Sequence, residues 1–88
     1  MRNVFVGSLA GLNQTNGQFN TYVGFNAAST NLSGDQNVAI GYNAGDGNIT
    51  GSNNIYIGRN TAATSATTSN EVVIGDTGIN KFRIPGIG

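Results

Sequence analysis

Short apolar runs recur along the chain at a constant interval of 17 residues. The runs occupy residues 4–6, 21–23, 38–40, 55–57 and 72–74, and a glycine follows each of them. These glycines form one column of equivalent positions: Gly7, Gly24, Gly41, Gly58 and Gly75. A fixed period of this length is typical of a solenoid, in which one small unit is copied and stacked. We therefore predict an all-β, parallel β-solenoid of five 17-residue units, each with a strand that ends in a turn at its glycine.

The apolar residues of each run divide between two faces of the expected strand. The outer two positions of each run are β-branched in every unit and share a face, because side chains alternate along a strand. We assign this face to the core: Val4, Val6, Val23, Val38, Ile40, Ile55, Ile57, Val72 and Ile74. We assign the middle positions to a face that contacts another chain: Phe5, Tyr22, Tyr56 and Val73. Strands that are apolar on both faces are typical of covered parallel sheets, and a second copy of the chain is the simplest cover.

A polar column accompanies the strands. Four residues before each glycine stand Asn3, Asn20, Asn37, Asn54 and Glu71. Stacked coils place such residues about 4.8 Å apart, which predicts a ladder of asparagines. The remainder of each unit predicts a tight turn, a short second strand and a polar loop. In that loop a second glycine column (Gly17, Gly34 and Gly51) indicates either a positive φ or a close approach by the neighbouring coil.

The last residues break the repeat. We place the repeat region at residues 1–79, and we predict that residues 80–88 form a C-terminal cap or a transition to another module. This segment contains Pro85, the only proline, and two of the four Lys and Arg residues. Because the repeat fills the chain almost from its first residue to its last, we expect the chain to be a fragment of a longer protein.

Composition strengthens the prediction that chains associate. Only 38% of the 88 residues are hydrophobic and Cys is absent, so a compact monomer has difficulty burying enough apolar surface. The net charge is zero and only 9% of residues are charged, so we expect no nucleic-acid partner. No apolar stretch is long enough to predict membrane insertion. The high Gly and Asn content resembles that of disordered chains, but the phasing of the apolar residues argues against disorder.

Three tandem segments resemble a known class of repeat. They are N-T-Y-V-G-F-N-A-A, N-V-A-I-G-Y-N-A-G and N-I-Y-I-G-R-N-T-A, at residues 20–28, 37–45 and 54–62. They resemble the head repeats of trimeric autotransporter adhesins and, more closely, related repeats of trimeric phage tail fibres. The resemblance implies a homotrimer of left-handed parallel β-rolls with two further copies of the chain as partners. The adhesin repeat is usually shorter, near 14 residues, which leaves open whether the chains form separate rolls or an intertwined triple β-helix.

Candidate chemistry is sparse. The chain has no His and no Cys, so we expect no enzyme, no catalytic residue, no metal site and no cofactor. The carboxylates Asp35, Asp46, Glu71 and Asp76 are interpreted as turn and solubilising residues, although a facing pair would suit a glycosidase. Arg59 and Asp76 occupy one column in successive units, which predicts an ion pair between coils.

The expected function is structural and adhesive. The resemblance implies a rigid segment of a viral tail fibre or bacterial surface adhesin, located on the virion or the cell surface, whose loops contact a host glycan or protein. One alternative is a carbohydrate-binding module in which Phe25 and Tyr42 stack on a sugar. The other alternative is a polysaccharide-degrading tailspike in which Asp35 and Asp46 act as acids.

Overall fold

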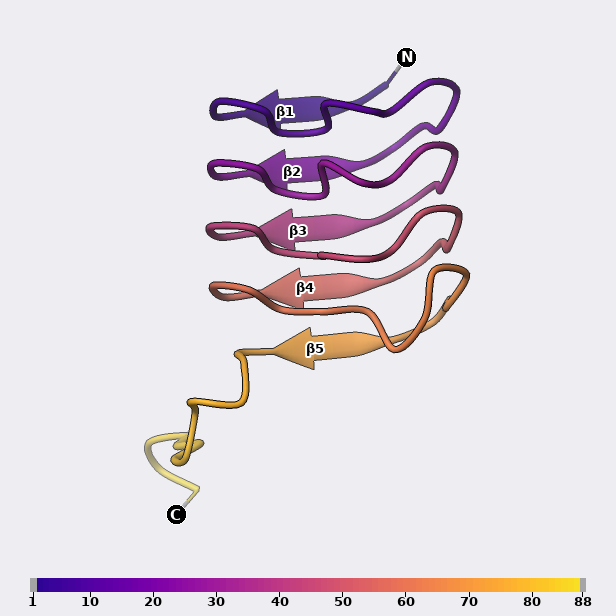
Figure 1. Cartoon of the computed structure of the whole chain (residues 1–88). Coiled ribbons are helices and arrows are strands. Elements are labelled where there is room, and N and C mark those ends of the chain that lie inside the picture. Colours follow the sequence, from indigo (N-terminus) through magenta and orange to yellow (C-terminus); the bar gives the residue numbers. More distant parts are fainter. Residues whose placement is uncertain (1, 88) are drawn as a thin grey trace.

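Five short parallel strands form a single sheet in the structure, a computed structural model that describes residues 2–87. The strands are β1 (Val4–Val6), β2 (Thr21–Val23), β3 (Val38–Ile40), β4 (Ile55–Ile57) and β5 (Val72–Ile74). They stack in chain order, and all five arrows point the same way (Figure 1). Each residue of β1 to β4 pairs with the residue 17 positions later, as Val4 does with Thr21. The predicted all-β parallel solenoid is confirmed.

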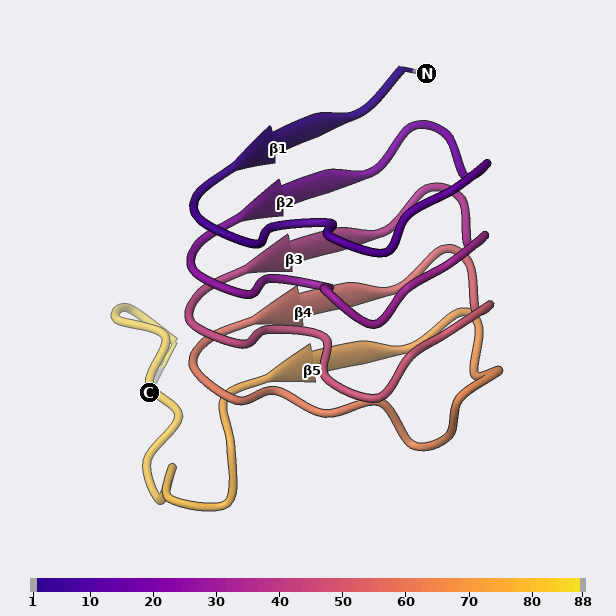
Figure 2. The same ribbon diagram turned by 45° about the horizontal axis from the view of Figure 1, so that its top comes forward.

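Each coil consists of a strand and a return segment that lies against the inner side of the sheet (Figure 2). Four coils are complete, and the fifth unit contributes β5 before the chain leaves the stack (Figure 1). The prediction of a second strand in each unit is wrong. In the return segments of the described residues, the one strand-like pairing is the isolated bridge between Asp46 and Ala62. Left-handed residues interrupt the return segment, with φ of 63° at Asn26 and 48° at Ala28.

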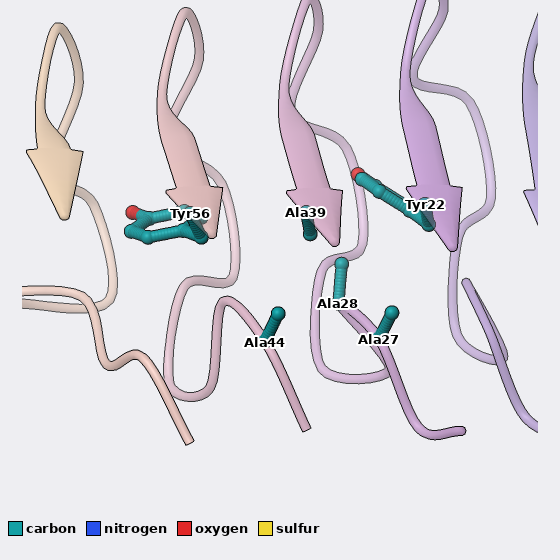
Figure 3. Close-up of a cluster of buried hydrophobic side chains, with 6 residues drawn as sticks. All are labelled: Tyr22, Ala27, Ala28, Ala39, Ala44 and Tyr56. Carbon is teal, nitrogen blue, oxygen red and sulfur yellow. The ribbon is translucent and has the colours of Figure 1, made fainter. Parts of the chain in front are cut away.

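The middle residue of each strand points into the coil. Tyr22, Ala39 and Tyr56 are buried and face alanines of the return segment, as Figure 3 shows. The facing residues are small: Ala27, Ala28 and Ala44. Phe5 stacks on Tyr22 with ring centroids 4.8 Å apart, and Val73 packs against the same cluster. The interior is therefore a thin layer of side chains, one ring or one methyl group deep.

The predicted sides of the strand are inverted. The residues assigned to the core are exposed or half-buried on the outer side of the sheet: Val4, Val6, Val23, Val38, Ile40, Ile55, Ile57, Val72 and Ile74. Those assigned to a chain–chain face line the interior instead, namely Phe5, Tyr22, Tyr56 and Val73. Alternation separates two faces without saying which is inside. The missed signal is the asparagine column, which shares parity with the middle residues and is itself buried.

Buried asparagines link every coil to the next. The Oδ1 atom of Asn37 accepts a hydrogen bond from the backbone N–H of Asn54 at 3.0 Å, and its Nδ2 atom donates to the Gly51 carbonyl at 2.9 Å. Asn20 repeats both contacts one coil earlier. The predicted ladder is thus confirmed in a different form, since each amide joins backbone groups rather than the next amide. The amide suits this position because it carries its acceptor and its donor on two separate atoms, which reach two different backbone groups.

The two glycine columns have different causes. Gly24 has a φ of +129°, and a Cβ atom there would lie 2.6 Å from the Gly41 carbonyl oxygen of the next coil. Gly34 has no positive φ, but a Cβ atom there would lie 2.0 Å from the Gly51 carbonyl oxygen. The first column therefore needs glycine for its backbone conformation and its close approach, and the second needs it for close approach alone.

Both repeated columns change type where the stack ends. Thr68 replaces the glycine of the second column, and Glu71 replaces the asparagine of the ladder. Within residues 72–87 no closed coil follows to approach Thr68 or to supply a carbonyl to position 71. Glu71 instead accepts hydrogen bonds from the backbone N–H and the hydroxyl of Thr64. The sequence thus departs from its repeat at the positions that would contact a further coil.

Candidate functional site

The main exposed feature of the coils is the outer side of the sheet. We call it the outer sheet face and define it by ten residues: Val4, Val6, Thr21, Val23, Val38, Ile40, Ile55, Ile57, Val72 and Ile74. Seven of them are 39% to 62% exposed, and the other three are half-buried. None is charged. A continuous apolar surface of this kind on a small protein indicates an interaction site.

The fold holds this face flat and regular. All five strands pair in register, so each outward side chain lies above its equivalent in the next unit. Nine of the ten residues are Val or Ile, whose branched Cβ atoms restrict the first side-chain torsion. The backbone beneath is anchored from inside by the ladder, as between Asn20 and the N–H of Asn37 at 2.9 Å. The chain's own contacts therefore hold the position of this face.

Phe25 and Tyr42, the predicted glycan contacts, lie together on the coil surface just after the turn glycines. Their rings stack on each other with centroids 5.8 Å apart and an interplanar angle of 14°. Both are about half exposed. A sugar normally packs on an aromatic face, and here each ring uses one face to cover the other. A sugar would therefore have access only to the ring edges and to the face of each ring that points away from the pair.

Three of the four carboxylates contact another residue of the chain, namely Asp35, Glu71 and Asp76. The Arg59 Nε and Asp76 Oδ2 atoms lie 3.3 Å apart, which confirms the predicted pair between coils. Asp35 accepts a hydrogen bond from the backbone N–H of Gln18 at 2.7 Å, and Glu71 is bound by Thr64. Within residues 2–87, no three Asp or Glu side chains gather as metal ligands would. The carboxylates contribute mainly to coil stacking and turns.

The interior tyrosines are held neutral. Burial raises the pKa of the Tyr22 and Tyr56 phenols above the ordinary value of 10. The Tyr22 hydroxyl donates to Gln14 Oε1 at 2.9 Å, and the Tyr56 hydroxyl accepts from Asn48 Nδ2 at 3.0 Å. Each phenol therefore has a polar partner inside the coil. Their environment is that of core residues rather than of proton donors to a substrate.

Comparison with protein-family models, curated proteins and solved structures found no match. The function must therefore be argued from the surfaces of the molecule. In the part of the chain that the structure describes, no helix is long and apolar enough to span a membrane. The outer sheet face is the strongest candidate, and sequence reasoning identified its residues while assigning them to the interior.

Proposed function

We propose that the chain is a structural segment of a trimeric fibre or adhesin, in which three chains pack together through their outer sheet faces. The observation that carries the proposal is the uniformly apolar, uncharged outer sheet face, which leaves Val4, Ile40 and Ile74 in water in a single chain. Burying one such side chain contributes roughly 1.5–3 kcal/mol. Three flat faces arranged about an axis parallel to the stack would bury them together.

The proposed role is to form a rigid stack of coils and to present polar loops at its surface. Coil-to-coil hydrogen bonds run through every unit, so the stack resists local opening in the manner of other solenoids. The polar loops, such as residues 30–36 before β3, lie at the ends of the strands and would project from the trimer. Following the resemblance to tail-fibre and adhesin repeats, we propose a virion or cell-surface location, left-handed rolls and host attachment through such loops.

The molar mass in solution tests assembly. One chain has a mass of 9.0 kDa, so a trimer is expected at three times that mass by light scattering. A folded monomer at micromolar concentration would reject the proposal.

A carbohydrate-binding role is separable from assembly. Phe25 and Tyr42 each cover one face of the other ring, and we expect a Phe25→Ala/Tyr42→Ala variant to leave attachment to host surfaces unchanged. Loss of glycan binding in this variant, with its molar mass unchanged, would favour the carbohydrate-binding alternative instead.

A further inference from the structure

The C-terminal segment, residues 79–87, exposes more apolar surface than its own chain covers. Phe82 is 74% exposed and Ile87 is 80% exposed, the highest values among the large hydrophobic residues described. Ile79 and Ile84 are also exposed. Figure 1 shows this segment leaving the stack beyond β5. Four large apolar residues in such a short segment are typical of a surface that is covered by a partner.

The segment is held only loosely by its own coils. Among the described residues, no hydrogen bond joins residues 80–87 to any coil, and the backbone bond from the Ile87 N–H to the Ile84 carbonyl is internal to the segment. Beside the last two strands it leaves an open groove of about 380 Å³. Ile57 and Ile74 of the outer sheet face line one side of this groove, and Ile79 and Phe82 line the other.

In a trimer each chain contacts two neighbours, and a stable interface buries roughly 800 Å² of accessible surface on each partner. The ten part-exposed residues of the outer sheet face would have to be shared between both neighbours. The groove and the C-terminal segment continue the same apolar surface past β5, so they are the nearest source of additional area.

We propose that residues 79–87 clasp a second copy of this chain, with Phe82 and Ile84 packed on the Ile57 and Ile74 side chains of the neighbour. This inference rests on the proposed trimer. In a parallel trimer the neighbour's last two strands lie at the same height as the groove. Lys81 and Arg83 also line the groove. In the clasp their aliphatic stems would lie on the apolar surface while their charges stay in water.

Cysteine cross-linking tests the clasp, because the natural chain has no Cys. The variant Ile57→Cys/Phe82→Cys is oxidised mildly and separated without reductant. A disulfide needs the two Cα atoms within about 7 Å, so it reports the contact directly. We expect covalent dimers and trimers. The matched control Ser33→Cys/Phe82→Cys, with one thiol on the polar loop before β3, should not form them. The single variant Ile57→Cys measures any disulfide between equivalent thiols about the trimer axis, which can give dimers but not trimers.

The outcomes separate the clasp from the trimer. A trimeric mass with only intrachain disulfides, or with none, would overturn the clasp and leave the trimer standing. A monomeric mass of the unmodified chain would overturn both. As a second readout that needs no cysteine, removal of residues 80–88 should raise the concentration at which the trimer dissociates at least tenfold. An unchanged dissociation concentration would also overturn the clasp.

Discussion

The two faces of the sheet are both apolar, yet they differ in how their side chains vary from unit to unit. The inner column changes size at almost every step, through Phe5, Tyr22, Ala39 and Tyr56. The outer columns hold β-branched residues in all five units. Inside a coil, each side chain needs to fit only the residues that face it, so size can alternate against alanine and glycine. Outside, the proposed partner would meet all units at once, which would favour uniform side chains.

The interior should be the more sensitive of the two faces. In Ala39→Asp, a carboxylate would enter a fully buried site whose neighbours are methyl groups and rings. We expect destabilisation of about 4 kcal/mol or more, enough to unfold the coils. Loss of the β-sheet signal in far-ultraviolet circular dichroism would report it. A folded Ala39→Asp chain would show that the interior is misassigned.

The close approach of coils sets the next largest effect. In Gly34→Ala, the added methyl group would meet the Gly51 carbonyl oxygen at 2.0 Å, so two coils must separate. We expect a loss of about 3 kcal/mol, measured by urea denaturation.

A second glycine provides the control for close approach. Gly47 also lies beside an aspartate in a loop, but a Cβ atom there meets nothing within 4 Å. The remaining cost of Gly47→Ala is that of holding an alanine at a φ of +86°, which we expect to be about 1–2 kcal/mol. Equal losses in the two variants would contradict close packing of the second glycine column.

Alkaline pH should weaken the interior selectively. The folded chain holds the Tyr22 and Tyr56 protons above the ordinary phenol pKa of 10, whereas the unfolded chain releases them near it. The stabilising contribution is therefore complete below pH 10 and declines above it, by up to about 1.4 kcal/mol per pH unit for each tyrosine. Denaturation midpoints between pH 9 and pH 11 would measure this decline. A Tyr22→Phe/Tyr56→Phe variant with an equally steep decline would exclude these phenols as its cause.

The surface ion pair should matter least. The Arg59 side chain is 71% exposed, so its contact with Asp76 is well screened by water. We expect Arg59→Ala to cost less than about 1 kcal/mol, measured as a small shift in the melting temperature. A larger loss would mean that Arg59 contributes packing that the ion pair alone does not explain.

The repeat made the solenoid predictable, because equal spacing of glycine and β-branched residues determines strand position and register together. The ladder was also predictable, since Asn20, Asn37 and Asn54 recur at one offset. Alternation alone does not say which side of the strand is inside, because it is symmetric between faces. Only the asparagine column, which shares parity with the middle residues, distinguishes the two sides. The second strand predicted in the return segment was wrong because Ala28 adopts a left-handed conformation, which is unusual for alanine and is not predicted by its residue type. What covers the outer sheet face stays a prediction, since one chain alone does not contain it.

The central claim is that the β-branched face belongs to an interface and not to the core. Sedimentation velocity of Ile40→Asp tests it most directly, because it reports both mass and compactness. The outer position of Ile40, 40% exposed in the single chain, predicts that the coils stay folded while the charge prevents face-to-face packing. We expect a compact 9.0 kDa monomer where the unmodified chain sediments as a trimer. An expanded, unfolded Ile40→Asp chain, or one that still assembles like the unmodified protein, would contradict the account.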